Sequence, residues 1–270
     1  MKVFIDTPQE FYIDGYLKEN LDKAKDTIQK DWDMVFSVDG YEGSGKSVFA
    51  QQVAFYCDPT FNIDRIVFTP QAFQRVILNA EKNQAVIYDE AYTGLSSRAT
   101  MSQINKALVT MLAEIRQKNL FVLIVMPTFF DLDKYVALWR SRVLFHIYTS
   151  KDFERGYFAF YNIDRKKDLY VNGKKYYSYA IPSPNFIGRF TNHYTVNEQD
   201  YRDRKYKATK AKDTRNEDKK LIEQVNEVIF ERLMKTDETI KVKTKIALSG
   251  LSEVTFYRKL KAYRQIEANH

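Results

Sequence analysis

Cysteine and histidine are scarce in this chain. Its 270 residues include one cysteine, Cys57, and three histidines. A single cysteine excludes an internal disulfide framework and a cysteine-based zinc site. His146, His193 and His270 lie too far apart in sequence to suggest a metal motif. We therefore expect Cys57 to be no more than a buried thiol.

Long hydrophobic runs are also missing. No stretch approaches the ~18 apolar residues that a membrane span requires. The longest run, 120–130, contains Pro127 and is better explained as a core strand. The N-terminus, which begins Met1-Lys2-Val3, has no signal-peptide pattern. These absences predict a protein without a membrane span that acts in the cytoplasm, or in the host cytoplasm if it is viral.

What the chain does have is a phosphate-binding signature. Residues 40–47 read Gly-Tyr-Glu-Gly-Ser-Gly-Lys-Ser, a complete Walker A motif, and an apolar run at 34–38 precedes it. Glycines let successive backbone N–H groups turn toward phosphates. The lysine then reaches the β- and γ-phosphates, and the following hydroxyl ligates Mg²⁺. The sequence therefore predicts binding of ATP and Mg²⁺. The residues expected at the nucleotide are Gly40, Gly43, Ser44, Gly45, Lys46, Ser47 and Val48.

An apolar run that ends in two acids supplies the second element. Residues 85–88 are followed by Asp89 and Glu90, and ligands of open α/β sheets bind at the carboxyl ends of strands. We expect Asp89 to orient the water ligands of the Mg²⁺ ion that Ser47 binds. Glu90 is the candidate base for the attacking water, although it could also be a surface acid beside a helix start. A glutamate here favours ATP hydrolysis over phosphoryl transfer to a metabolite.

Further residues are candidates for the reaction. Thr128, just past an expected strand, is placed to hydrogen-bond the γ-phosphate or the attacking water, or simply to end the strand. Arg116, Arg140 and Arg142 precede strands, and each is either structural or an arginine finger acting on ATP of a neighbouring subunit. Arg116 is the first choice. The expected catalytic residues are Lys46, Glu90, Arg116 and Thr128.

Residues 1–200 alternate between strand and helix patterns. An N-terminal helix is expected, with an apolar face made by Leu17, Leu21, Ala24 and Ile28. Apolar strands are expected at 34–38, 65–69, 84–89, 121–126 and 143–149. Helical patterns separate these strands, which predicts a RecA-like, three-layer α/β P-loop sheet that is mostly parallel.

Two aromatic-rich runs follow, at 156–162 and 169–180. The second contains Asn172-Gly173, a strong turn signal, so we expect an antiparallel β-hairpin extension of the sheet. Interleaved aromatic and basic residues can stack on single-stranded bases. Alternation between a buried and an exposed strand face explains the same pattern and is favoured.

Positive charge is concentrated after this region. Of the net charge of +7, residues 201–220 carry +5, because nine Lys/Arg stand against four Asp/Glu. We expect a basic linker at 201–217, which either contacts DNA phosphates or is a solvated connector.

A helical domain is expected at 218–270. After a helix at about 218–235, residues 243–261 resemble a helix-turn-helix: one helix ends at Gly250, Ser252 caps the next, and Phe256 and Leu260 point inward. A small helical module for protein contacts is the alternative. The residues expected to face DNA are Lys245, Thr255, Tyr257, Arg258 and Lys261.

Together these elements resemble the additional-strand, catalytic-glutamate P-loop ATPases. Within them, the chain is most similar to the HerA/FtsK-like branch, which includes viral DNA-packaging and Zot-like phage ATPases. The resemblance covers 34–150, and 116–120 matches the arginine-containing segment that precedes a strand in FtsK-like motors. The chain departs from that family at Pro127-Thr128, where a sensor glutamine is usual, and from Zot-like ATPases in lacking a transmembrane helix. The resemblance implies a ring, commonly a hexamer, that acts on DNA.

Three classes of function remain open. The first is an ATP-hydrolysing DNA motor that translocates or packages DNA for a virus or mobile element. The second is a non-translocating switch, such as a helicase loader or transposition regulator, that assembles on DNA and recruits a partner protein. The third, a small-molecule kinase, is disfavoured by Glu90 and by the lack of an arginine-rich lid. The basic linker and tail favour the DNA-dependent ATPases.

Overall fold

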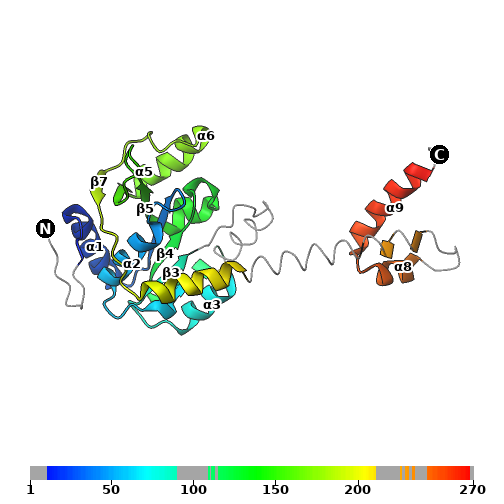
Figure 1. Cartoon of the computed structure of the whole chain (residues 1–270), viewed down its shortest axis with the longest axis horizontal. Coiled ribbons are helices and arrows are strands. Elements are labelled where there is room, and N and C mark those ends of the chain that lie inside the picture. Colours follow the sequence, from blue (N-terminus) through cyan, green and yellow to red (C-terminus); the bar gives the residue numbers. More distant parts are fainter. Residues whose placement is uncertain are drawn as a thin grey trace. The chain divides into compact units, whose positions relative to one another are not determined.

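The computed structural model describes residues 11–89, 109, 111–112, 115–210, 226, 229–230, 233–234 and 242–267. The chain forms two compact units, Met1–Ala208 and Thr209–His270. The first holds a seven-stranded mixed sheet flanked by helices, and the described part of the second is helical (Figure 1). The first unit thus extends past residue 200, where the sequence suggested the start of a linker.

The sheet of the first unit is parallel over five strands and antiparallel over the last two. Its order is β2-β3-β4-β1-β5-β6-β7. The pairs from β2 to β5 are parallel, whereas β5–β6 and β6–β7 are antiparallel. The expectation of a mostly parallel α/β sheet is confirmed. The strands are β1 (Met34–Gly40), β2 (Ile66–Val67), β3 (Ala85–Asp89), β4 (Phe121–Val125), β5 (Ser141–Tyr148), β6 (Tyr157–Tyr161) and β7 (Phe186–Arg189).

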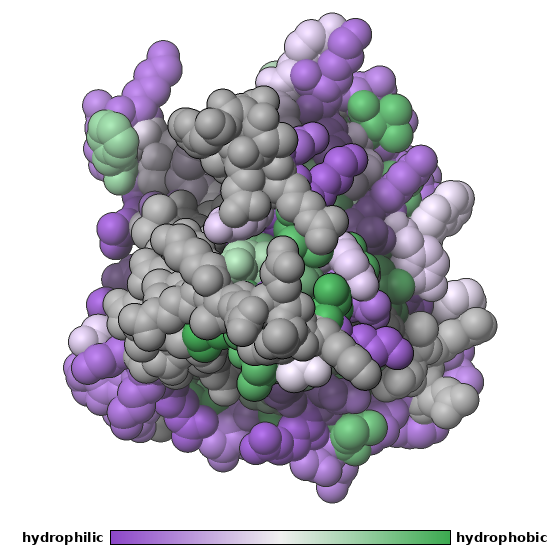
Figure 2. Space-filling view, turned by 90° about the vertical axis from the view of Figure 1, so that its right-hand side faces the viewer, coloured by the Kyte–Doolittle hydropathy of each residue, from purple (hydrophilic) through white to green (hydrophobic). Residues whose placement is uncertain are grey.

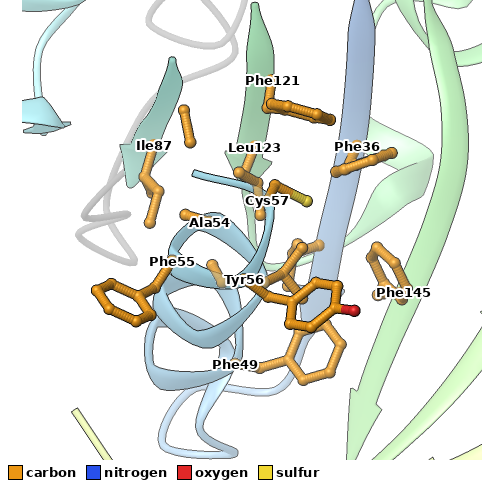
Figure 3. Packing of buried hydrophobic residues seen from close by; sticks show 14 of the residues in the cluster. Phe36, Phe49, Ala54, Phe55, Tyr56, Cys57, Ile87, Phe121, Leu123 and Phe145 are labelled. Atoms are coloured by element: carbon orange, nitrogen blue, oxygen red, sulfur yellow. The ribbon is translucent and has the colours of Figure 1, made fainter. Parts of the chain in front are cut away.

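The central strands are buried on both faces, as their mostly apolar sequences predict. Side chains alternate between the two faces of a strand, so Phe36 and Val38 join one hydrophobic cluster and Val35 joins the other. Figure 3 shows the first cluster, in which Phe49 and Ala54 of one helix pack on Phe36 and the neighbouring strands. Two cores of this kind define a three-layer arrangement.

Two helices, α1 (Gly15–Ile28) and α2 (Lys46–Cys57), cover the first face. The Asp14 side chain caps α1 by accepting a hydrogen bond from Leu17 N at 3.1 Å. The buried face of α1 is the expected one: Leu17, Leu21, Ala24 and Ile28. Cys57, at the end of α2, is buried, and burial raises the pKa of its thiol. The expectation of a buried thiol is confirmed.

Shorter helical segments contribute to the second face or connect the strands. Buried residues of several of them, such as Phe73, Phe129 and Val136, belong to the cluster on the opposite side of the same strands. The helix α3 begins at Pro70 with Thr69 as its N-cap, a favoured combination. The segments are η1 (Ile63–Arg65), α3 (Pro70–Asn79), η2 (Ile115–Lys118), η3 (Phe129–Asp131), η4 (Val136–Arg140), α5 (Ile163–Asp168), η5 (Leu169–Gly173) and α6 (Lys174–Tyr176).

The expected hairpin at 169–180 is wrong. These residues begin in helical structure, in η5 and α6, and the antiparallel extension is made by β6 and β7 instead. The buried residues of the segment follow helical spacing, i, i+3, i+4 and i+7: Lys166, Leu169, Tyr170 and Gly173. Gly173 has a negative φ, −67°, so it does not form the turn that Asn-Gly suggested. The run at 156–162 does contain a strand, β6.

The second unit is described mainly by α8 (Val242–Ser249) and α9 (Glu253–Glu267). Gly250, with φ +65°, separates them, and Ser252 Oγ accepts a hydrogen bond from Thr255 N at 3.3 Å. Phe256 is buried against Phe230, with ring centroids 5.2 Å apart. Most of the helix expected at 218–235 lies outside the described residues.

Hydrophilic residues make up most of the described surface in Figure 2, and hydrophobic residues interrupt it singly or in small groups. Scattered apolar residues of this kind are normal on protein surfaces. None of the helices in the described part of the chain combines the length and apolar character needed to cross a membrane.

Candidate functional site

Three strand ends meet at one edge of the parallel sheet. Gly40 ends β1, Asp89 ends β3, and Thr128 follows β4, which lies between them. Gly40 N donates a hydrogen bond to Pro127 O at 3.3 Å, which ties the first end to the third. Ligands of open α/β sheets bind at this edge, so it is the candidate functional site.

The loop at 40–45 has a shape that only glycine allows at two positions. Gly40 has φ +136°, and a Cβ there would lie 2.0 Å from Ile147 O of the neighbouring strand. Gly45, the residue before α2, has φ +101°, and a Cβ there would meet the Phe190 ring at 3.1 Å. Both positions combine a left-handed backbone with a close approach. The loop therefore keeps its turn and leads directly into the first turn of α2.

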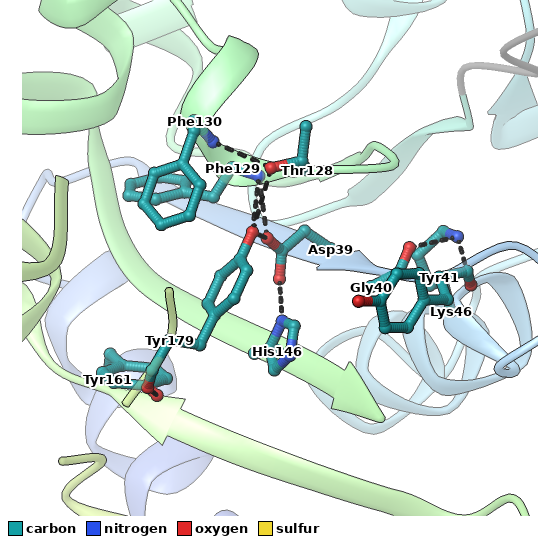
Figure 4. A network of polar contacts seen from close by, with 10 residues as sticks. All are labelled: Asp39, Gly40, Tyr41, Lys46, Thr128, Phe129, Phe130, His146, Tyr161 and Tyr179. Carbon is teal, nitrogen blue, oxygen red and sulfur yellow. Dashed lines mark hydrogen bonds and ion pairs between the residues drawn. The ribbon is translucent and has the colours of Figure 1, made fainter. Parts of the chain in front are cut away.

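Lys46 lies over this loop. Its ammonium donates hydrogen bonds to Gly40 O at 2.7 Å and to Tyr41 O at 2.8 Å (Figure 4). Burial lowers the pKa of Lys46, and the positive charge of Lys205 lowers it further. The carboxylates of Asp89 and Asp39 act in the opposite direction. The Lys46 amine is thus held at the loop by two backbone carbonyls and lies in the field of one lysine and two aspartates.

Two serine hydroxyls, of Ser44 and Ser47, lie in the loop and in the first turn of α2. Ser44 is buried, and its Oγ has no hydrogen-bond partner among the described residues. A buried unpaired hydroxyl costs free energy, so such a group calls for an explanation. Ser47 Oγ accepts a hydrogen bond from Lys205 Nζ at 3.2 Å. Val48, also expected near the nucleotide, is buried at the start of α2.

Asp89 is buried and contacts residues from the far end of the first unit. Tyr201 OH donates to Asp89 Oδ2 at 2.5 Å. Lys205 Nζ lies 3.3 Å from Oδ1 and 3.1 Å from Oδ2. Burial, followed by the charge of Asp89, raises the pKa of Tyr201, so its hydroxyl remains a donor. Ser47 and Asp89, the two residues expected at the metal, therefore contact the same ammonium group.

A second buried aspartate, Asp39, lies one residue before Gly40. Phe129 N donates to its Oδ2 at 2.7 Å, and His146 Nδ1 lies 2.9 Å from its Oδ1. Tyr179 OH also donates to Oδ2, and its ring stacks on His146 with centroids 3.7 Å apart (Figure 4). These contacts join the start of the loop to the turn after β4 and to β5.

Thr128 belongs to that turn. Its side chain accepts from Phe130 N at 3.3 Å and lies 3.1 Å from Tyr179 OH. The residue therefore caps η3, and its hydroxyl also faces the Asp39 cluster. Its catalytic role remains a prediction.

The three candidate arginines are placed differently. Arg140 donates to the buried carboxylate of Asp33 and to Leu112 O, and Arg142 lies over the Trp32 ring at 4.9 Å. Both have partners within their own unit, which favours a structural role for each. The backbone of Arg116 lies in η2, before β4 as expected, while its side chain and the whole of Glu90 lie outside the described residues.

Five residues of this edge were not predicted: Asp39, His146, Tyr179, Tyr201 and Lys205. They come from four separate parts of the chain, so no local motif identifies them. The spacing of Tyr201 and Lys205, four apart on one helix face, was the one available signal. The high net charge of residues 201–220 favoured a solvated linker over a packed helix, so this spacing was given no weight.

In the second unit, the expected DNA-facing residues gather on and around α9. Tyr257, Arg258 and Lys261 are exposed, whereas Thr255 and Lys245 of α8 are half-buried. Phe256 points into the unit, as expected for its inward face.

Within the described ranges, no group of three or more His, Cys, Asp or Glu is arranged to hold a metal ion. In comparisons with known proteins, no family model matches the chain and no curated protein matches it.

Proposed function

We propose that this chain is a Mg²⁺-dependent P-loop ATPase that works on DNA as a motor. The observation that carries the proposal is the meeting of Ser47 Oγ and the Asp89 carboxylate on one cation, Lys205 Nζ. A hydroxyl after the loop lysine and an aspartate at a strand end are the pair that holds Mg²⁺ in P-loop enzymes. Residues 47 and 89 are 42 positions apart in the sequence, and the sheet brings them together.

The residues present fit a magnesium nucleotide. The Ser44 hydroxyl is a buried polar group without a hydrogen-bond partner among the described residues, and the loop at 40–45 has the glycine-dependent turn that a phosphate-binding loop needs. In this proposal Lys46 binds the β- and γ-phosphates, Ser47 and Asp89 hold the metal, and Glu90 takes a proton from the attacking water. The bound metal supplies charge neutralisation at the phosphates.

The order of the strands supports the family resemblance. β4 separates β1, which leads into the glycine loop, from β3, which ends in Asp89. A strand in this place is compatible with the resemblance to the additional-strand ATPases. Thr128 at the end of β4 is therefore kept as the candidate sensor, and Arg116 as the candidate finger toward a neighbouring subunit.

The DNA-directed part of the proposal rests on charge and on the second unit. The exposed Tyr257, Arg258 and Lys261 of α9 offer cations and an aromatic side chain to a groove or its phosphates. We propose that α8 and α9 act as a helix-turn-helix and that the ATPase works as a ring, with a hexamer as the expected size.

Steady-state ATP hydrolysis with and without double- or single-stranded DNA, at two salt concentrations, tests this function. We expect DNA to stimulate hydrolysis and salt to weaken the stimulation. Lys46→Ala should abolish productive nucleotide binding, whereas Glu90→Gln should keep binding and block turnover. Hydrolysis that is indifferent to DNA would contradict the DNA-directed role, and normal turnover by Glu90→Gln would contradict its role as base.

A translocation assay then separates a motor from a switch. Directional displacement of a strand or movement along a duplex is expected for the motor. ATP-dependent filament formation without movement would instead indicate the loader or regulator.

A further inference from the structure

The side chain of Lys205 extends from the helical segment at 198–210 to Ser47 and Asp89 in the candidate site. Its ammonium lies 3.2 Å from Ser47 Oγ and within 3.3 Å of both carboxylate oxygens of Asp89. The Asp89 side chain is only 2% exposed, and that of Lys205 is 35% exposed. One basic side chain thus contacts both residues that the proposed function assigns to Mg²⁺.

Tyr201 fixes the helix that carries this lysine. It is buried, donates to Asp89 Oδ2, and packs with Phe68 and Tyr194 at centroid distances of 6.0 and 5.8 Å. Residues four apart lie on the same helix face, so Tyr201 directs Lys205 at the aspartate. Lys205 Nζ also lies 3.0 Å from Tyr201 OH. The contact is therefore supported by packing and is more than a chance approach of a long surface side chain.

We propose that Lys205 is an intrinsic competitor of Mg²⁺ and sets the metal concentration that the site requires. This inference rests on the proposed function. Mg²⁺ binds its oxygen ligands at about 2.0–2.1 Å. An ammonium group that contacts Ser47 Oγ and both Asp89 oxygens occupies the place of the ion and of the water ligands that Asp89 would orient, and it repels the ion. Lys205 must leave before the metal is bound.

The lysine can leave without disturbing the helix. Its side chain has four carbons and rotates freely where it is exposed, and a third of it already faces solvent. Tyr201 remains packed in the hydrophobic cluster when only the side chain of Lys205 swings out. The exchange is therefore a local one, and its cost is the loss of a partly buried ammonium–carboxylate contact.

The test compares Lys205→Met with a matched control, Lys207→Met, on the same helical segment. Methionine keeps much of the apolar stem and removes the charge, and Lys207 is exposed. Binding of Mn²⁺, as a stand-in for Mg²⁺, is followed in the presence of ADP by loss of the free-ion electron paramagnetic resonance signal. We expect Lys205→Met to bind Mn²⁺ about tenfold more tightly and Lys207→Met to match the wild type. The Mg²⁺ concentration for half-maximal ATP hydrolysis should fall in parallel.

Unchanged or weaker Mn²⁺ binding by Lys205→Met would overturn the inference, as would a loss of hydrolysis at saturating Mg²⁺, because Lys205 would then belong to the reaction itself. Lys205→Gln, which keeps a polar donor, replaces the methionine variant if that variant unfolds. Failure of the proposed function gives a different result: no ADP-dependent Mn²⁺ site in the wild type or in any variant. If the wild type has an ADP-dependent Mn²⁺ site and Lys205→Met binds Mn²⁺ with the same affinity, only the proposed competition by Lys205 is contradicted.

Discussion

The edge of the sheet holds two buried aspartates, and they differ in what surrounds them. Asp39 and Asp89 each lie at the carboxyl end of a parallel strand and each accepts a hydrogen bond from a tyrosine hydroxyl. Among the residues that the structure describes, the other donors to Asp39 are the Phe129 N–H, on the turn after β4, and the ring of His146, on β5. Within the described residues, the other donor to Asp89 is Lys205, whose side chain is 35% exposed.

This difference separates a fixed contact from an exchangeable one. A backbone N–H in a packed turn cannot move away, so Asp39 holds the loop and the neighbouring turn in one geometry. A lysine side chain can be replaced by another cation at little cost to the fold. We therefore expect Asp39 to support the fold and Asp89 to serve the chemistry.

Asp89→Asn should have the largest effect. It removes the charge that the metal needs, so hydrolysis should fall by about a hundred- to a thousandfold. The measurement is kcat at saturating Mg²⁺, with a thermal unfolding curve to show that the variant is folded. A kcat within tenfold of the wild-type value would contradict the proposed role of Asp89 in hydrolysis.

Asp39→Ala should act on stability first. It removes the carboxylate that Phe129 N–H and the Tyr179 hydroxyl share, and among the described residues it leaves these two donors only their contacts with each other and with Thr128. The loss should cost about 3 kcal/mol of unfolding free energy. Urea denaturation measures the loss. The exposed residue Asp26 supplies the control, since Asp26→Ala should change stability by less than about 0.5 kcal/mol. A loss below about 1 kcal/mol in Asp39→Ala would argue against a supporting role.

Lys166 is a fully buried lysine that donates to a carbonyl, Ala137 O, whereas Lys205 contacts a carboxylate. Burial lowers its pKa from 10.5 to about 7. Between these values the unfolded chain binds a proton that the folded chain does not, so this group makes stability rise with pH by up to about 1.4 kcal/mol per unit and adds no slope below about pH 7.

Lys166→Met should remove that slope. Urea unfolding at pH 7, 8 and 9 should show the wild type gaining stability relative to the variant as pH rises. Lys134→Met, at an exposed position, should keep the wild-type slope. Parallel curves for the wild type and Lys166→Met would show that the buried amine keeps its proton throughout.

Tyr179→Phe and Tyr201→Phe are a matched pair with the smallest expected effect. Each removes one hydroxyl that donates to an aspartate, at a cost of about 1 kcal/mol of stability. Only Tyr201→Phe should also lower the Mg²⁺ concentration for half-maximal hydrolysis, because it frees an oxygen of Asp89. Equal metal dependence in both variants would remove the distinction between the two aspartates.

The sequence predicted those features that depend on neighbouring residues. Apolar runs located the parallel strands, and the face of α1 followed from helical spacing. The motif at 40–47 and the acid at 89 placed the site at one edge. Residues 169–180 misled because Asn172-Gly173 is a turn signal, while the buried positions 166, 169, 170 and 173 have helical spacing. The helical spacing is hard to recognise in the sequence because its first buried position holds a lysine, Lys166, and lysine is not expected in a core.

The contacts that were missed are long-range. Asp39 meets Tyr179, and Asp89 meets Tyr201, across more than a hundred positions. Burial of a tyrosine and placement of a lysine at such distances depend on how the sheet closes, which no local pattern encodes. The sequence predicts a linker at 201–217, whereas residues 201–208 belong to the first unit.

The buried state of Cys57 has a practical consequence for spectroscopy. The only thiol of the chain is shielded from solvent, and its raised pKa keeps it protonated at neutral pH, so maleimide reagents react with it slowly. A cysteine introduced at the exposed position 207 would take up a label selectively, with no need to replace the native one. A fluorophore or spin label there would report directly whether the helical segment at 198–210 stays in place while Lys205 leaves Asp89.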